Sequence, residues 1–329
     1  IKGRNVATSH LLNDTIRGAN KSLFTELDSP ETADNGGGFL NAFVTDGFSV
    51  TSGGSGDNAV NDGSYNYVSW NWKAGGSSAS SDSNGSITSS VSANTTAGFS
   101  IVTYTGNGAS AATVGHGLGV APAMYWVKAR TEPTGGVHFG TDQGNWIVYA
   151  KPLNAGGIDE TDAILLNKTD DLVDSAGAWN DTAPTSTVFT IGTADDVNES
   201  GDTYVAYCFA NVDGYCKVGS YDGNGDGDGP QIITGFRPAW LILKNIDSDG
   251  TNWWMFDNKR SISNVVNDGI IEQGADAEFS DNSNLQIDFL SNGFKLRTSS
   301  SSGYDNNTNG GTVIYMAFAE QPFKFANAR

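Results

Sequence analysis

The feature that most constrains this chain is an internal repeat. Residues 104–108, Tyr-Thr-Gly-Asn-Gly, recur at 221–225 as Tyr-Asp-Gly-Asn-Gly. In both copies a proline follows, and a lysine stands six positions after that proline, at Lys128 and Lys244. Each copy closes on an apolar run that ends in Phe-Ala. The repeat therefore predicts two complete units of one fold.

A third, shorter copy opens the chain. By its alignment with the others, residue 1 falls inside a strand of a unit whose first quarter is missing. We expect the chain to be the C-terminal part of a longer polypeptide, because a sandwich without its opening strands exposes unpaired edges. The matched segments are 1–4 with 127–130, 14–17 with 257–260, 43–48 with 289–294, and 67–72 with 204–209.

Short runs of β-branched and aromatic residues alternate with clusters of Gly, Asn, Asp and Ser, and almost no stretch has helical periodicity. This pattern is typical of antiparallel sandwiches. We predict an all-β fold of tandem antiparallel β-sandwich repeats, jelly-roll-like, with little or no helix. The predicted parts are a truncated sandwich at 1–74, a Gly- and Ser-rich linker at 75–85, and complete sandwiches at 86–211 and 212–329.

The charge of the chain excludes some partners. With 37 acidic and 18 basic residues the formal net charge is -19, so phosphate backbones are repelled and nucleic acid is not an expected partner. No window approaches 18 consecutive apolar residues, which argues against membrane insertion through a helix. The two cysteines, Cys208 and Cys216, flank a predicted turn and would form either a disulfide or two buried free thiols.

No catalytic constellation stands out. The three histidines, His10, His116 and His138, are not spaced as metal ligands, and we assign each a structural or surface role. Neither a nucleophile elbow nor a phosphate-binding loop occurs at a strand-to-helix turn. Two carboxylates across a groove would suit glycoside hydrolysis, but nothing singles out a pair among the scattered acids. We predict that the protein is not an enzyme.

One loop has half of a calcium motif. Asp222, Asn224 and Asp226 alternate with glycines as in the first half of a calcium-binding loop, and Asp228 follows. The twelfth position is Ile233, so the bidentate glutamate is missing. The sequence leaves open a Ca²⁺ site at these four residues or a solvated hairpin turn.

Three tryptophans form a second candidate site. Trp146, Trp253 and Trp254 stand next to asparagine near predicted loop ends, where an indole can stack on a sugar while amide and carboxylate oxygens bind hydroxyls. The alternative is core packing, because large aromatic residues dominate the cores of sandwiches and these recur between copies. We treat the three residues as candidates for glycan binding.

Three segments carry a resemblance to a known family. Residues 97–108, residues 114–119 with Pro122, and residues 315–329 resemble a module of large virion proteins from marine tailed bacteriophages, which are labelled tail fibre or structural protein. The resemblance implies exposure on the virion surface, self-association that is often trimeric in fibres, and contact with a host surface. It brings no catalytic residue.

These features together predict a non-enzymatic virion structural protein, a tail fibre or appendage that attaches to the host surface through its sandwich loops. The expected partners are further copies of the chain, other virion proteins, and a host glycan or protein. Two alternatives stay open, namely a decoration component of capsid or tail that binds other virion subunits, and a bacterial surface filament or adhesin. No cofactor other than Ca²⁺ is expected.

Overall fold

The computed structural model describes residues 1–33, 38–51, 60–76, 78–139, 142–151, 162–299 and 304–322. The prediction of an all-β fold with little helix is confirmed, because antiparallel strands make up the sheets and the two helices, α1 (Ala176–Trp179) and α2 (Asp195–Asn198), are single turns. Neither helix in these ranges is long or apolar enough to span a membrane. Residues 323–329, which carry part of the phage resemblance, lie outside the described ranges.

The middle unit, residues 78–211, is built on an eight-stranded sheet faced by a two-stranded one. The sheet extends further toward the N-terminus than the sequence predicts, because β8 (Ser80–Asp82) lies within the proposed linker and pairs with β9 (Ser89–Asn94). The linker prediction is therefore wrong for these residues. The large sheet has the order β15 (Val173–Asp174), β14 (Asp162–Leu165), β13 (Ile147–Ala150), β12 (Met124–Ala129), β17 (Thr203–Phe209), β10 (Phe99–Thr105), β9 (Ser89–Asn94) and β8 (Ser80–Asp82), and the small sheet pairs β11 (Ala112–Gly115) with β16 (Val188–Ile191).

The C-terminal unit, residues 212–322, repeats this plan with fewer strands. A five-stranded sheet again places the closing strand of the unit between its opening strand and the strand that carries the repeated lysine. The orders are β18 (Cys216–Asp222), β25 (Thr312–Ala319), β20 (Pro238–Asn245), β21 (Trp253–Asp257) and β22 (Ile270–Ile271) in one sheet, and β19 (Gln231–Ile233), β24 (Gly293–Leu296) and β23 (Ile287–Leu290) in the other.

The N-terminal unit, residues 1–74, has three small sheets. The register of one hairpin agrees with the predicted match of 43–48 with 289–294, because Phe43 pairs with Phe48 as Phe289 pairs with Phe294. The sheets are β1 (Lys2–Gly3) with β7 (Tyr67–Val68), β2 (Leu11–Leu12) with β3 (Lys21–Phe24) and β4 (Thr32–Ala33), and β5 (Leu40–Val44) with β6 (Gly47–Val50).

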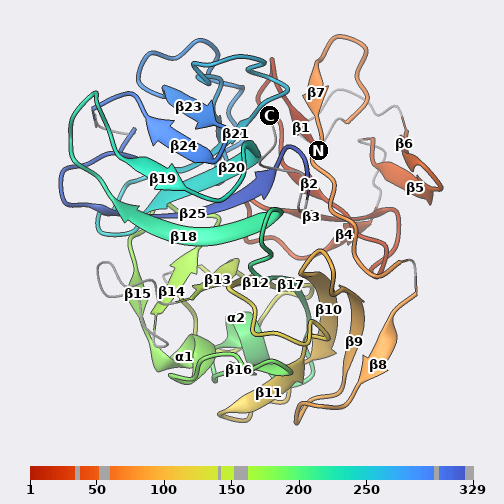
Figure 1. Cartoon of the computed structure of the whole chain (residues 1–329). Coiled ribbons are helices and arrows are strands. Elements are labelled where there is room, and N and C mark those ends of the chain that lie inside the picture. The colour runs from red at the N-terminus through yellow and green to blue at the C-terminus, as the bar shows by residue number, and fades with distance from the viewer. Residues whose placement is uncertain are drawn as a thin grey trace.

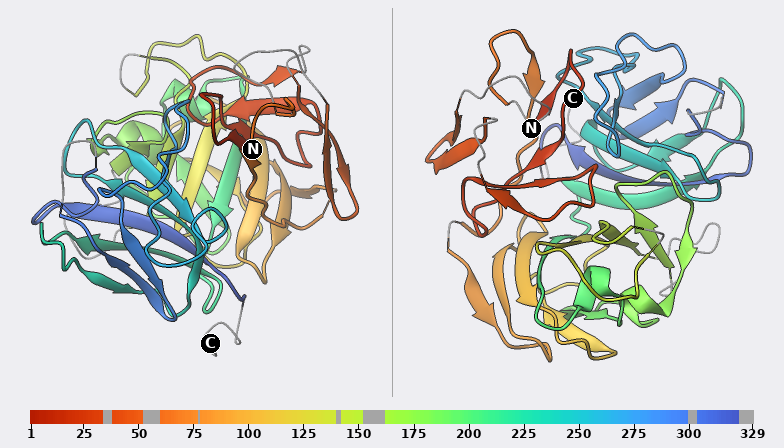
Figure 2. Two further views of the ribbon diagram at one scale, coloured as in Figure 1. Left: turned by 90° about the horizontal axis from the view of Figure 1, so that it is seen from above. Right: turned by 180° about the vertical axis from the view of Figure 1, so that it is seen from behind.

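The three units lie around a common centre, as Figure 1 and the two further views in Figure 2 show. One hydrophobic cluster joins them, and it contains Leu23 of the N-terminal unit, Ile164 of the middle unit and Ile270 of the C-terminal unit. These residues hold matching positions, since each pairs with its neighbouring strand in the same register. The units follow one another in sequence but share one core in space, which the sequence did not reveal.

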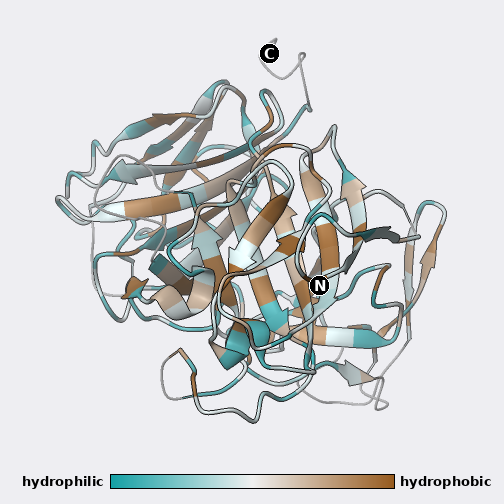
Figure 3. Cartoon of the chain, turned by 90° about the horizontal axis from the view of Figure 1, so that it is seen from below, coloured by the Kyte–Doolittle hydropathy of each residue, from teal (hydrophilic) through white to brown (hydrophobic). Residues whose placement is uncertain are grey.

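Each complete unit also has a core of its own. The outer face of the eight-stranded sheet packs on β11, β16 and the two helical turns, and the outer face of the five-stranded sheet packs on β19, β23 and β24. Figure 3 shows hydrophobic residues gathered on the strands and hydrophilic ones along the loops. The large sheets are therefore buried on both faces, which explains why β12 and β13 are buried at every position.

Candidate functional site

The predicted glycan-binding tryptophans are not available to a ligand. Trp146 is 0% exposed and Trp253 1%, and each indole Nε1 donates a 2.9 Å hydrogen bond to a backbone oxygen of another unit, Phe24 O and Leu165 O respectively. Trp254 is 1% exposed and packs between Phe279 and Tyr304. The glycan-binding prediction is wrong for all three residues. Trp146 and Trp253 are buried at boundaries between units, and Trp254 is buried in the core of the C-terminal unit.

Buried lysines tie the units together in a closed ring. The repeated lysine of each unit lies on the strand that pairs with the closing strand of that unit, and its ammonium donates to a backbone oxygen of a neighbouring unit. Burial lowers the pKa of each of the three lysines to about 8. The bonds are Lys128 Nζ to Asp28 O at 2.9 Å, Lys244 Nζ to Thr169 O at 3.1 Å, and Lys2 Nζ to Ala275 O at 3.3 Å.

We name the three contacts by the units they join: N/middle, middle/C and C/N. A second bond recurs beside each contact, within one unit, where a backbone N–H donates to a side-chain oxygen of its own unit. The positions of these amides correspond to Trp146, Trp253 and His10 in the three copies. The bonds are Trp146 N to Asn167 Oδ1 at 3.0 Å, Trp253 N to Gln273 Oε1 at 2.9 Å, and His10 N to Glu26 Oε2 at 3.1 Å.

His10 takes the place of tryptophan at the C/N contact. Its Nε2 lies 3.1 Å from Gly274 O, and its Nδ1 lies 3.4 Å from a carboxylate oxygen of Glu272. Burial, with the charge of Lys2 adding to it, lowers the pKa of His10 well below its usual value. Burial, reinforced by the charge of Glu26, raises the pKa of Glu272 to about 8. These shifts place a neutral imidazole beside a protonated carboxyl group at neutral pH.

A buried ionic network crosses the N/middle contact. Arg17 Nε lies 2.5 Å from Asp14 Oδ2 and Arg17 Nη1 lies 3.1 Å from Glu31 Oε2, and from the middle unit Arg130 Nε reaches the same Glu31 oxygen at 2.9 Å. The hydroxyl of Tyr207, also in the middle unit, donates to Asp14 at 2.6 Å. Burial alone would raise the pKa of Glu31, but the hydrogen bonds and charges of the two arginines lower it to about 2.

The C/N contact has the same network from matching residues. Arg260 Nε lies 2.6 Å from Asp257 Oδ2 and Arg260 Nη1 lies 2.9 Å from Glu278 Oε2. From the N-terminal unit Arg4 binds both oxygens of Glu278, at 2.7 and 2.9 Å, and the indole of Trp70 donates to Asp257 at 3.1 Å. The sequence alignment of 14–17 with 257–260 identified half of this network without showing that its side chains pair.

The middle/C contact has the same backbone hydrogen bond between units as the other two contacts. Among the described residues, however, no charged side chain occupies a position that matches the ionic networks. The N–H of Leu172 donates to Ile246 O at 3.1 Å, as that of Glu31 does to Arg130 O and that of Glu278 to Arg4 O. The pairing register of the strands identifies the other residues of this contact that match the network residues of the other two. The residues that stand in the network positions are Ala150, Leu172, Ile246 and Met316, all within or against the central cluster.

The predicted calcium loop binds itself. Asn224 Oδ1 accepts from the N–H of Asp226 at 3.0 Å, and Asp226 Oδ1 accepts from the N–H of Asp228 at 2.9 Å. The carboxylate of Asp228 lies 2.9 Å from Lys295 Nζ, whose charge and hydrogen bond lower the pKa of Asp228. Among the described residues, no three His, Cys, Asp or Glu side chains, including Asp222, gather as metal ligands. The loop has the geometry of a solvated turn.

The cysteines and the other two histidines are structural. Cys208 and Cys216 are free and buried, which decides between the two alternatives for these residues, and burial raises the pKa of the Cys208 thiol to about 12. His116 is buried in the glycine-rich turn, with Nε2 3.2 Å from Thr185 O. His138 Nε2 lies 2.8 Å from Gly135 O. The structural reading of the histidines agrees with these contacts.

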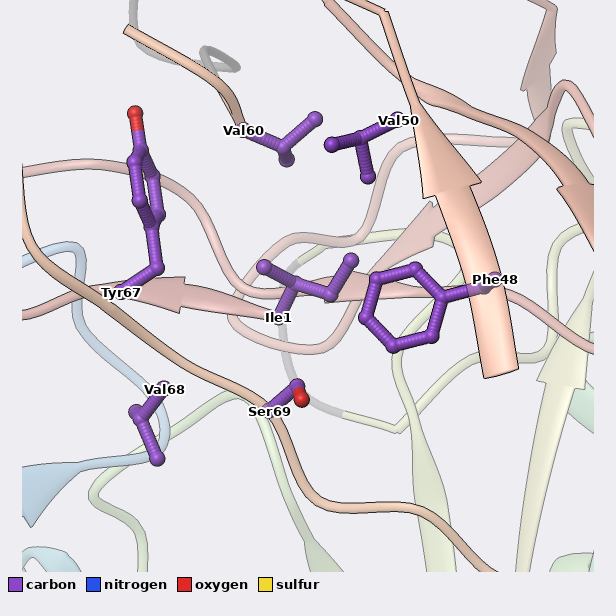
Figure 4. A pocket seen from close by; sticks show the side chains of 7 residues that line it. All are labelled: Ile1, Phe48, Val50, Val60, Tyr67, Val68 and Ser69. Atoms are coloured by element: carbon purple, nitrogen blue, oxygen red, sulfur yellow. The ribbon is translucent and has the colours of Figure 1, made fainter. Parts of the chain in front are cut away.

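Two cavities of modest size open on the described surface. One, of about 310 Å³, lies beside Pro122, Lys151 and Pro184. The other, of about 200 Å³, lies in the N-terminal unit, where apolar side chains including Phe48 and Tyr67 surround it (Figure 4). Neither is lined by a pair of acids or by a nucleophile beside a base.

A family model described as "Domain of unknown function (DUF7483)" matches residues 1–322. The chain belongs to this family. The match runs through all three units, so the closed ring of lysine ties lies within one DUF7483 domain. No curated protein and no solved structure matches the chain.

Proposed function

We propose that this chain is a non-enzymatic structural protein of a virion, a module of a tail fibre or appendage that attaches to the host surface through its outer loops. The observation that carries the structural role is the use of the buried charged residues. The acids of the two networks accept bonds from Arg130, Tyr207, Arg4 and Trp70 of a neighbouring unit, and the three lysines donate to neighbouring units, so these groups join units of the same chain rather than lining a cleft. Such contacts build a rigid scaffold that positions loops.

The shape of the scaffold supports the proposed attachment role. Loops with polar tips, such as residues 222–229, leave the sheets on the outer side, while the aromatic side chains are drawn inward. A surface of this kind makes weak individual contacts, and a particle that displays many copies multiplies them. The net charge of -19 keeps such copies soluble and apart from nucleic acid. The virion location itself rests on the resemblance of residues 97–108 and 315–329 to phage structural proteins.

Immunogold electron microscopy tests this proposal. An antibody against the purified chain should label tail fibres on phage particles whose genome encodes the sequence. The purified chain should also bind host cells, and it should release no oligosaccharide from their surface polysaccharide. Particles that stay unlabelled, or release of oligosaccharide, would contradict the proposal.

A decoration component on capsid or tail is the second candidate. The burial of Trp146, Trp253 and Trp254 favours it, since these candidates for stacking on a sugar are at most 1% exposed and leave glycan adsorption without its expected side chains. Gold label on capsid faces or along the tail tube, with no binding of the chain to cells, would favour this role over attachment.

A further inference from the structure

The cavity of about 310 Å³ beside Pro122 has a counterpart in the C-terminal unit that polar side chains close. The two places match by their backbone bonds, since the N–H of Lys151 donates to Ala123 O at 2.7 Å as that of Asn258 donates to Ala239 O at 3.0 Å. Both lie beside the start of the strand that carries the repeated lysine, β12 in one unit and β20 in the other. The closed copy therefore shows which groups the open copy lacks.

In the C-terminal unit three polar side chains meet at this place. Arg237 Nε lies 3.2 Å from Glu320 Oε2, and Asn258 Nδ2 donates to Glu320 Oε1 at 2.9 Å. The N–H of Glu320 also donates to Arg237 O at 2.8 Å. A carboxylate thus binds an arginine through one oxygen and an amide through the other.

The middle unit has neither the arginine nor the carboxylate. Ala121 stands in the place of Arg237, since each directly precedes the proline of its copy. Asn211 stands in the place of Glu320, since each directly follows the Phe-Ala that ends its copy, in the same strand register. The backbone bond from Glu320 to Arg237 has no equivalent between Asn211 and Ala121, and no described residue donates to Ala121 O. The cavity therefore has an exposed carbonyl oxygen on its wall.

The mouth of the cavity is apolar. Val120 is 51% exposed there, whereas Phe236 at the matching position is 0% exposed. Pro122 and Pro184 form further apolar walls. Ligand sites of small molecules are lined mainly by apolar groups with a few polar groups between them, and about 300 Å³ is the lower end of their range.

The one charge on the cavity is positive. Lys151 takes the place of Asn258, whose side chain binds the carboxylate in the C-terminal unit. Among the described residues that line the cavity, Lys151 is the only charged one. An ammonium at this position can form a charge-assisted hydrogen bond with a carboxylate that enters from outside, in the place that Glu320 takes in the other copy.

The amide of Asn211 is held in position by the chain that follows it. Its Oδ1 accepts from the N–H of Val218 at 2.6 Å, and its Nδ2 donates to Val218 O at 3.4 Å. A side-chain amide has two N–H donors, so the second remains for a ligand. The cavity thus offers one cation, one donor and one acceptor beside its apolar walls.

We propose that this cavity binds an acidic sugar residue of the uronic acid type. Lys151 binds the carboxylate, the Asn211 amide and Ala121 O bind hydroxyls, and the apolar walls pack against the C–H groups of the ring. This inference names the ligand class of the proposed attachment role and so rests on that role.

The surroundings favour a sugar over an acidic peptide. A peptide that binds through its backbone adds to an open strand edge. The strands that border the cavity, β12 and β13, each have a neighbouring strand on both sides. The polar groups of the cavity instead match the carboxylate and the hydroxyls of a single ring.

Calorimetric titration of the whole chain with two trisaccharides, one of galacturonic acid and one of glucuronic acid, tests the proposal. We expect saturable one-to-one binding of at least one of them. Its methyl ester keeps the ring but removes the charge, and it should bind roughly tenfold more weakly or worse, because the charge-assisted bond is lost. Tetraglutamate, an acidic peptide, should not bind.

Three variants assign the binding to the cavity. Lys151→Met should weaken binding of the acidic trisaccharide roughly tenfold or more, whereas Lys259→Met, at another exposed lysine, should bind as the wild type does. Ala121→Leu fills the cavity without changing its charge and should also weaken binding. All three side chains are exposed, so the melting temperature of each variant should stay within a few degrees of the wild type.

Several outcomes would overturn the proposal. No heat with either trisaccharide at millimolar concentration would do so, as would equal binding of an acid and its methyl ester. Equal losses in Lys151→Met and Lys259→Met would show a general effect of charge, and binding of tetraglutamate as tight as that of the sugar would assign the cavity to a protein partner.

Cell binding separates this inference from the proposed function. A chain that binds host cells but neither trisaccharide would overturn the inference and leave the attachment role in place. A chain that binds the trisaccharide through Lys151 but does not bind host cells would support the sugar site and contradict the attachment role.

Discussion

The N/middle and C/N contacts are ionic at the positions where the middle/C contact is apolar. At the first two, an Asp-x-x-Arg segment, a glutamate and an arginine of the next unit form one network. At the third, Ala150, Leu172 and Ile246 occupy matching positions, and the backbone bond between Leu172 and Ile246 is unchanged. The same backbone geometry is therefore compatible with either chemistry.

The contacts that set the arrangement of the three units differ from the side chains that fill the space between the units. The tie common to all three contacts is the lysine ammonium on a carbonyl of the neighbouring unit, and within each unit a side-chain oxygen accepts from the amide at position 10, 146 or 253. Removing one partner of a buried ion pair is costly, because the other charge stays buried and unpaired. The complete pair, however, stabilises a fold little more than apolar residues that fill the same volume. We infer that the lysine bonds set the arrangement of the three units, and that either ionic or apolar side chains can occupy the network positions.

The largest expected effect comes from breaking one network at its centre. Arg17→Met leaves Asp14 and Glu31 buried without their shared partner, and it should lower the free energy of unfolding by about 3 to 5 kcal/mol. Chemical denaturation at pH 7 measures it. The control is Arg237→Met, since Arg237 pairs with Glu320 at a partly exposed site, and its loss should stay below about 1 kcal/mol. An equal loss in the free energy of unfolding for the two variants would show that burial of the network does not determine its contribution.

Converting the whole network should reverse that loss. A variant with Asp14→Ala, Arg17→Leu, Glu31→Leu, Arg130→Ile and Tyr207→Met gives the N/middle contact the character of the middle/C contact. We expect a free energy of unfolding between that of the wild type and about 4 kcal/mol above it, by the same denaturation assay. A variant less stable than Arg17→Met alone would show that the networks themselves hold the ring.

Acid should distinguish the two kinds of contact. The pKa of Glu31 is lowered to about 2 in the fold, from 4.5, so the contribution of Glu31 is complete above pH 4.5 and is lost as the pH falls toward 2. The pKa values of Asp14 and Glu278 are lowered as well, with the same sign. The converted variant should therefore lose less stability than the wild type between pH 4.5 and 2. Parallel melting curves across this range would contradict it.

A smaller effect is expected at Glu272, where the C/N contact differs from the other two. Its pKa is raised to about 8, so the folded state holds a proton that the unfolded state releases above about pH 4.5, and stability falls as the pH rises from 4.5 to 8. Glu272→Gln should match the wild type near pH 4.5 and exceed it by about 2 kcal/mol near pH 6, with a further gain as the pH rises toward 8. Glu132→Gln, at an exposed residue, is the control. A gain that does not change with pH would indicate another cause.

The smallest effect is expected from calcium. The oxygens of Asn224 and Asp226 accept hydrogen bonds from their own loop, and Asp228 pairs with Lys295. Titration with millimolar Ca²⁺ should therefore produce no binding heat and no shift in melting temperature. A saturable shift that disappears in Asp226→Asn would restore the calcium site.

The sequence predicted the parts of the fold that local pattern determines. Alternating residues gave the all-β class, and the repeat register matched Phe43 with Phe289, which the hairpins confirm. The linker prediction was wrong at β8 because an edge strand needs no large apolar residue, so its composition resembles that of a loop.

The candidate site was predicted less well, because its partners are distant in sequence. A tryptophan beside an asparagine has the same local pattern whether it faces solvent or another unit, and the acceptor of Trp146 is Phe24 O, in a different unit. In the sequence, nothing distinguishes Glu31 and Glu278 from the other scattered acidic residues. The repeated Asp-x-x-Arg segments were the one available signal, since two opposite charges three residues apart recurred at matching positions.

The ring of lysine ties has a consequence for how the molecule tolerates change. In a ring of three identical subunits, one codon specifies all three contacts, so every mutation is imposed three times at once. Here each contact has its own codons, and Lys2, Lys128 and Lys244 can be altered one at a time. Arginine at positions 4 and 130 with isoleucine at 246 shows the result, in which two contacts have charged residues at these positions and the third has an apolar one. A covalent ring can thus differ from one contact to the next, which identical subunits cannot do without changing all three.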